Sequence, residues 1–134
     1  FIDIGNDAID FSASNSKDYQ NIFINIGDKS LSAGENSKVI VKNSVFKDSE
    51  LALVVKDGSE LISESNNFHN NSLDYCAFIK KTFYRQPILR IKDYKGEKYL
   101  FQNGVTIHSN HKSFERVVDV ESLLYGNIYG RASN

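Results

Sequence analysis

The chain has 134 residues, of which sixteen are basic and seventeen acidic, so its formal net charge at pH 7 is −1 with histidine neutral. A chain of this length forms one domain that can bury a core without disulfides or metal, and its single cysteine excludes an intrachain disulfide. The balanced charge gives no global field that would recruit nucleic acid or an anionic membrane, and no apolar run is long enough for a membrane span. We therefore expect no nucleic-acid partner and no membrane span.

The N-terminal two thirds of the chain repeat with a period of about 22 residues. Segments starting at positions 5, 27, 49 and 72 align: GNDAIDFSAS, GDKSLSAGEN, SELALVVKDG and SLDYCAFIKK. One mostly apolar column of this alignment contains Ile9, Leu31, Leu53 and Cys76. A second column, two positions later, contains Phe11, Ala33, Val55 and Phe78. Because side chains alternate along a strand, both columns face the same side, and each repeat predicts one core-facing strand.

A polar corner and a second strand follow each core-facing strand. The corners ASNS, GENS and KDGS supply residues that favour turns. In the second strand, Val39 and Leu61 share one column, and Ile24, Phe46 and Phe68 share another. The last repeat starts one position later than the others predict. We expect the extra residue of the third repeat in a loop, at Asn70 or Asn71, where an insertion is tolerated.

A repeat of about 22 residues is too short for a βαβ unit, which needs about 30 residues. It suits one coil of a solenoid, in which like residues stack at roughly 4.8 Å. The leucine-rich pattern LxxLxLxxN and the calcium-binding nonapeptide GGxGxDx are absent from the repeats. We predict an all-β fold, a right-handed parallel β-helix.

The chain begins inside a repeat. Residues 1–4, FIDI, align with residues 23–26, FINI, and there is no methionine. We therefore expect a fragment of a longer protein, with further coils upstream of Phe1.

The repeat ends near Pro87, the only proline, which cannot donate to a strand ladder. Beyond it, ILRIKDYKGEKYLF predicts two strands that form a hairpin with its turn at Lys95-Gly96, and QNGVTIHSN predicts an Asn-Gly turn and a short strand. Residues 118–124 fit either a strand or a short helix. Because an open last coil exposes strand edges and an apolar bore, we predict coils over residues 1–87 and a C-terminal β-rich cap of the same domain over residues 88–134.

Three phrases carry a resemblance: NIGDKSLSAGENSKVIVKNSVF, LALVVKDGS and AFIKKTFY. The coils resemble the right-handed parallel β-helix of the pectate-lyase-like superfamily. The phrases are similar to β-helix repeat regions of large bacterial surface, polysaccharide-associated or spore-coat-protein-H-like proteins, although Ser30 departs from their GDKG pattern. The resemblance covers residues 1 to about 85. It implies a carbohydrate role at the cell surface or outside the cell. The superfamily also includes purely structural stalks, and the resemblance transfers no catalytic residue to this chain.

Two groups of residues are candidates for chemistry. Glu35, Asp57 and Lys80 occupy one position of successive coils, where Asp57 is expected to pair with Lys80. They could act as acid and base on a sugar or bind a cation, although we favour an ion-paired corner that fixes register. The second group is the basic and aromatic stretch Lys80, Lys81, Tyr84 and Arg85. Aromatic rings stack on sugars and cations attract anionic sugars, so this stretch is the candidate ligand-binding site, unless it only closes the core.

Other polar groups give weaker signals. Asp7, Asp10, Asp28 and Lys29 form a cluster with too few aligned carboxylates for a lyase calcium site. His69, His108 and His111 are interpreted as solvated loop residues. We predict no metal and no cofactor, and we expect Cys76 to be a buried, unreactive thiol in the interior column.

These observations favour a non-catalytic scaffold or a carbohydrate-recognition part of a larger bacterial protein, with a possible polysaccharide and upstream domains of the same polypeptide as partners. One alternative is a polysaccharide lyase or hydrolase that acts on an acidic glycan. Another is a protein–protein assembly module that docks on the outer sheet, where Val54 and Ile79 are expected to face outward.

Overall fold

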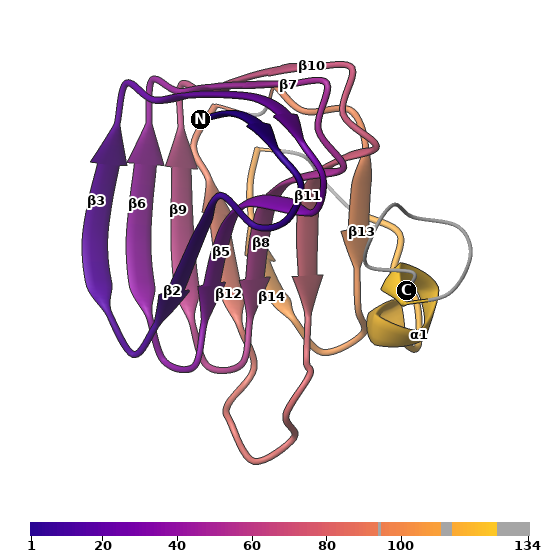
Figure 1. Cartoon of the computed structure of the whole chain (residues 1–134). Helices are drawn as coiled ribbons and strands as arrows, with labels where there is room; N and C mark the ends of the chain where they lie inside the picture. The colour runs from indigo at the N-terminus through magenta and orange to yellow at the C-terminus, as the bar shows by residue number, and fades with distance from the viewer. Residues whose placement is uncertain (94, 111–113, 126–134) are drawn as a thin grey trace.

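The computed structural model describes residues 1–93, 95–110 and 114–125. These residues form a parallel β-solenoid of about five turns, built from three parallel sheets, as the sequence predicted (Figure 1). The chain visits the sheets, here named A, B and C, in the same order on each of the first turns. No described helix is long and apolar enough to cross a membrane.

Each sheet takes its strands from successive coils. Sheet A consists of β1 (Ile2–Ile4), β4 (Ile22–Ile26), β7 (Val45–Lys47) and β10 (Asn67–His69). Sheet B consists of β2 (Ile9–Ser12), β5 (Lys29–Gly34), β8 (Leu51–Lys56), β11 (Leu73–Phe78) and β13 (Tyr99–Phe101). Sheet C consists of β3 (Asn15–Tyr19), β6 (Lys38–Lys42), β9 (Glu60–Glu64), β12 (Ile88–Ile91) and β14 (Thr106–His108).

The register of sheet B confirms the predicted columns in three coils and corrects the fourth. Ile9 pairs with Leu31 and Leu31 with Leu53, but the next partner is Tyr75 rather than Cys76. In the second column, Val55 pairs with Ala77, so placing Phe78 there was also wrong. The Tyr75 hydroxyl lies 3.1 Å from Ser63 Oγ inside the bore, which gives the buried phenol a polar partner.

The misplaced insertion explains this slip. Ser12 pairs with Gly34, but Asn15 pairs with Lys38, one position beyond the partner that the same offset would give. The extra residue therefore lies in the corner at residues 35–37. Leu51 pairs with Leu73, which is again the shorter offset, so no residue is inserted at Asn70 or Asn71.

Stacked aromatic rings fill the bore beside sheet A. The rings of Phe1, Phe23, Phe46 and Phe68 follow one another with centroid separations of 4.9, 4.8 and 5.3 Å. The predicted pairing of Phe46 with Phe68 is confirmed, whereas Ile24 was wrongly placed in their column, which Phe23 occupies. The alignment of FIDI with FINI is confirmed, because Ile2 pairs with Ile24 and Ile4 with Ile26.

The last strands continue the winding instead of forming a hairpin. β12 joins sheet C beside β9, and β13 joins sheet B beside β11, so the two strands flanking Lys95-Gly96 lie in different sheets. Both are parallel to their neighbours, because the chain keeps the path of the earlier coils. The predicted turn at Asn103-Gly104 is confirmed, with Gly104 at φ 92° before β14. The division at residue 87 stays a prediction.

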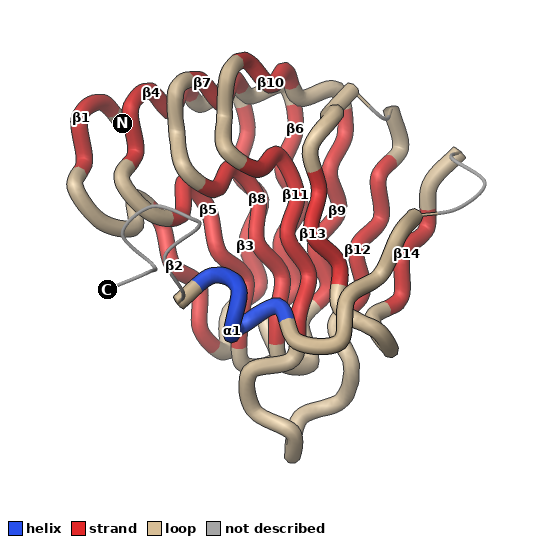
Figure 2. The backbone as a smooth tube through the Cα atoms, turned by 90° about the vertical axis from the view of Figure 1, so that its right-hand side faces the viewer, coloured by secondary structure: helices blue, strands red, loops and turns tan. Residues whose placement is uncertain are grey.

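A short helix, α1 (Val120–Leu124), covers the outer face of sheet B (Figure 2). Val120 and Leu124 pack into an outer apolar cluster that also contains Leu51, Val54, Leu73, Cys76, Phe78 and Leu100. Val54 does face outward, but it is fully buried, and Ile79 is half-buried against the inner core. The expectation that Val54 is an accessible docking residue was therefore wrong. Cys76 is buried as expected, but beneath α1 rather than in the bore.

Candidate functional site

The loop at residues 79–87, which connects β11 to β12, is the largest departure from the regular coil. Lys38 pairs with Glu60, whereas Glu60 pairs with Ile88, so the later coil contains six additional residues. These residues project beyond the end of the strands, at the bottom of Figure 1. The predicted ligand-binding residues Lys80, Lys81, Tyr84 and Arg85 all lie on this loop.

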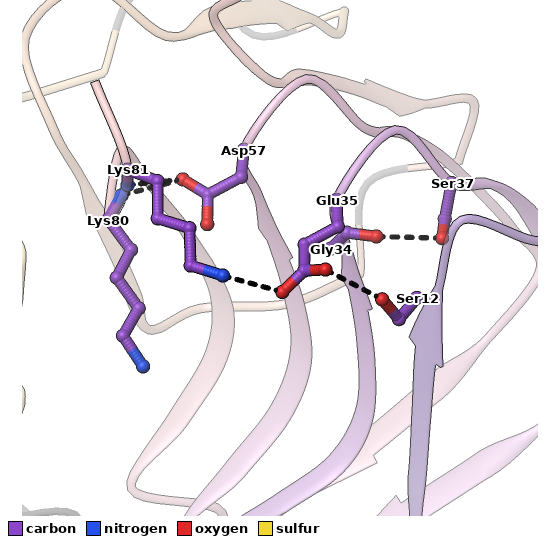
Figure 3. A network of polar contacts seen from close by, with 7 residues as sticks. All are labelled: Ser12, Gly34, Glu35, Ser37, Asp57, Lys80 and Lys81. Atoms are coloured by element: carbon purple, nitrogen blue, oxygen red, sulfur yellow. Dashed lines mark hydrogen bonds and ion pairs between the residues drawn. The ribbon is translucent and has the colours of Figure 1, made fainter. Parts of the chain in front are cut away.

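Asp57 anchors the start of the loop. It follows β8 in a corner with φ 44°, a left-handed conformation that aspartate tolerates better than most residues. Its side chain is buried, and Oδ1 accepts hydrogen bonds from the backbone N–H groups of Lys80 and Lys81, both at 2.8 Å (Figure 3). The expected ion pair between Asp57 and Lys80 was wrong, because Lys80 donates its backbone N–H and not its ammonium group. The charge-assisted pair of backbone bonds fixes where the loop leaves the solenoid.

Glu35 holds the loop from the preceding coil. Its Oε1 lies 2.8 Å from Lys81 Nζ, and its Oε2 accepts a hydrogen bond from Ser12 Oγ at 2.9 Å (Figure 3). The hydrogen bond from Lys81, together with that from Ser12, lowers the pKa of Glu35, and the same contact raises the pKa of Lys81. Both groups are therefore charged near neutral pH. The predicted trio thus comes together around one corner, with Lys81 rather than Lys80 as the ionic partner of a carboxylate.

A lysine that the sequence analysis missed lies beside this corner. The Lys56 side chain crosses Gly34, where an added Cβ would be 2.8 Å from Lys56 Cε. Burial lowers the pKa of Lys56, with Lys29 and Lys80 acting in the same direction. Gly34 and Lys56 end neighbouring strands of sheet B. A glycine at the strand end of one repeat and a lysine at the same position of the next repeat were therefore the sequence signal for this packing.

The tip of the loop presents aromatic rings. Phe83 is 79% exposed, and its ring centroid lies 4.7 Å from that of the half-buried Tyr84, with an interplanar angle of 35°. Arg85 is exposed, and its Nε donates to the carbonyl of Gly58 at 3.2 Å. Lys80 is also exposed and lies 5.8 Å from the centroid of the Tyr125 ring. Phe83 was not among the predicted residues, although it stands inside the quoted phrase AFIKKTFY.

The acidic cluster near the first corner is an internal ion network. Lys29 Nζ lies 3.2 Å from Asp28 Oδ2 and 3.5 Å from Asp7 Oδ1, and both Lys29 and Asp28 are buried. Burial raises the pKa of Asp28; burial alone would lower the pKa of Lys29, but Asp28 and Asp7 raise it overall. Asp10 pairs with Ser32 in sheet B and is exposed. The ammonium group of Lys29 thus occupies the space between the two carboxylates.

The histidines do not gather. His69 and His108 are exposed, but they end strands β10 and β14 rather than lying in loops, so that part of the interpretation was wrong; His111 lies outside the described residues. Within the ranges that the structure describes, no group of three or more histidine, cysteine, aspartate or glutamate side chains could hold a metal ion. Desolvation beneath α1 raises the pKa of the Cys76 thiol far above its ordinary value, so this thiol is a poor nucleophile.

No protein-family model, curated protein or solved structure matches the chain. The solenoid is therefore known from the structure itself.

Proposed function

We propose that this chain is a non-catalytic parallel β-helix scaffold that presents the loop at residues 79–87 for binding carbohydrate. The exposed ring of Phe83, flanked by Tyr84, carries the proposal. Aromatic faces stack on the apolar faces of sugars, and an exposed phenyl ring at the tip of an anchored loop suits that contact. The resemblance to β-helix regions of bacterial surface proteins supports the same role.

The charges of the loop favour an anionic sugar. Lys80 and Arg85 are exposed and flank the aromatic pair in the sequence of the loop, and both can donate hydrogen bonds to a carboxylate or sulfate group. Lys81 serves a different purpose, because its ammonium group is held by Glu35. We therefore expect acidic oligosaccharides to bind more tightly than neutral ones.

The positions of the two carboxylates support the non-catalytic part of the proposal. A general acid needs a proton at neutral pH, but the pKa of Glu35 is lowered by Lys81. Asp57 is 1% exposed and accepts two backbone hydrogen bonds through one oxygen. Both side chains therefore have a structural use that accounts for their presence.

The test is binding to a panel of oligosaccharides that includes oligogalacturonate, hyaluronan, chitin oligomers and mannan. We expect selective binding of acidic members, and Phe83→Ala should weaken it about 3- to 10-fold, the equivalent of one aromatic contact of ~0.5–1.5 kcal/mol. Tyr19→Ala, which removes an exposed aromatic ring on sheet C, is the matched control and should leave binding unchanged. Binding that ignores Phe83→Ala would place the glycan elsewhere, and no binding to any member would remove carbohydrate from the proposal.

A further inference from the structure

The outer face of sheet C carries a positive charge that the near-neutral net charge of the whole chain conceals. Its charged side chains come from β3, β6, β9 and β12 and from the residue that follows β12. They are Lys17, Lys38, Lys42, Glu60, Glu64, Arg90 and Lys92. Five basic groups against two carboxylates give this face a net charge of +3 with His108 neutral, whereas the chain as a whole has −1.

The two carboxylates of this face hold the cations in place, and their side chains are less exposed than those of the cations. Glu60 contacts Lys38 Nζ at 3.4 Å and Arg90 Nε at 2.9 Å, and its side chain is 16% exposed against 58% and 42% for the two cations. Glu64 likewise lies between Lys42 Nζ at 2.9 Å and Lys92 Nζ at 3.9 Å. Each carboxylate of the central strand therefore positions two cations on its neighbours, and an approaching surface meets the cations first.

Apolar and aromatic side chains lie between these cations. Ile40 pairs with Ile62 in the central column of this face, and Ile88 pairs with Glu60 in an adjacent column. None of these three isoleucines belongs to a buried apolar cluster. Tyr19 is 46% exposed, with Lys42 Nζ 6.0 Å from its ring centroid. No described element packs over this face, since α1 lies against sheet B on the other side of the molecule (Figure 1).

We propose that the outer face of sheet C binds a membrane surface rich in anionic lipid. Its cations form a grid. Those of β6 and those at β12 lie about 10 Å apart along the solenoid because β9 separates the two strands, and Lys17 on β3 lies beside β6. A grid suits a two-dimensional array of charged headgroups better than a single linear polymer does. Basic residues near an anionic bilayer each contribute about tenfold or less in affinity. Tyrosine and partly exposed isoleucine side chains suit the headgroup boundary. This surface is separate from the loop at residues 79–87 and does not depend on carbohydrate binding.

The test is cosedimentation with vesicles made of equal parts phosphatidylcholine and phosphatidylglycerol at low salt, with pure phosphatidylcholine vesicles for comparison. We expect binding to the anionic vesicles only, and added salt should weaken it. The double variant Lys38→Gln/Lys92→Gln removes the two most exposed cations of the ion-paired set, and it leaves Arg90 on Glu60 and Lys42 on Glu64. Its partition coefficient should fall roughly 10- to 30-fold.

Two further variants make the result specific to this face. Lys47→Gln/Lys95→Gln changes the net charge equally through exposed lysines outside sheet C and should bind like the wild type. Lys38→Arg/Lys92→Arg preserves charge and should also bind, while circular dichroism checks that every variant folds. The proposal is overturned by absence of binding to anionic vesicles at low salt, by equal losses in the two glutamine variants, or by binding of heparin or duplex DNA without binding of vesicles.

Discussion

At the scale of single residues, Asp57 shows how a carboxylate can suggest catalysis in a sequence and serve the backbone in the structure. The repeat correctly predicted that Asp57 lies at the same corner as Glu35 and the backbone of Lys80, but not that Lys81 would be the lysine whose ammonium group pairs with a carboxylate there. What the repeat could not predict was the partner atom. That choice depends on the path of the loop after β11, which turns the N–H groups of Lys80 and Lys81 toward the carboxylate.

Replacing Asp57 tests this anchoring role. Asp57→Ala leaves two N–H groups without their acceptor and places alanine at φ 44°, so we expect the free energy of unfolding to fall by about 2–4 kcal/mol. Asp57→Asn keeps an acceptor oxygen and a side chain that tolerates this conformation, and its loss should be clearly smaller. Urea denaturation followed by circular dichroism measures both. Equal stability of the alanine variant and the wild type would mean that the two hydrogen bonds do not hold the loop.

Phe83 marks the limit of prediction at this scale. Lysine, tyrosine and arginine in the same stretch were recognised as a binding candidate, but a phenylalanine in a repeat sequence is equally compatible with the bore. Only the loop geometry separates Phe83, which is 79% exposed, from the buried Phe23 and Phe46.

At the scale of secondary-structure elements, α1 depends on its contacts. A helix this short is not stable alone in water, so its stability must come from the Asp119 cap and from the burial of Val120 and Leu124 on sheet B. The sequence allowed this helix but did not predict its location. Apolar side chains on the outer columns of β8 and β11 were the available signal, and the one-position slip in the fourth coil hid it by placing Cys76 in the bore.

Cys76 reports on the docking of α1. In the wild type we expect the thiol to react with Ellman's reagent only on unfolding, because it is 1% exposed and its pKa is raised by burial. Leu124→Ala should loosen the helix and speed labelling at least tenfold under native conditions, whereas Glu121→Gln on the same helix should not. Rapid labelling of the native wild type would show that α1 does not cover sheet B in solution.

At the scale of the whole molecule, each coil contacts mainly its neighbours, and the ring stack beside sheet A links them. The regular repeat period was sufficient to predict this architecture from sequence, because stacked coils require like residues at like positions. It did not predict that residues 88–108 continue the winding, since an alternating segment does not reveal which sheet it joins. It also left the cations of sheet C unnoticed, because their columns emerge only when the second strand of every coil is aligned.

The stack predicts a graded response to removing a ring. Phe46 is fully buried between Phe23 and Phe68, so Phe46→Ala should lower the free energy of unfolding by about 3–5 kcal/mol. Phe1 is 46% exposed at the end of the same stack, and Phe1→Ala should have a much smaller effect. Thermal and urea unfolding measure the pair, and similar losses for the two variants would contradict a continuous stacked core.

The central claim is that this solenoid binds glycan without cleaving it, with Glu35 and Asp57 serving as anchors of the loop at residues 79–87. Mass spectrometry of acidic oligosaccharides after prolonged incubation with the chain tests it most directly, with Glu35→Gln and Asp57→Asn in parallel. The account predicts unchanged oligosaccharide masses in all three samples. Shortened or unsaturated products from the wild type that disappear in either variant would contradict it and identify the corner as an active site.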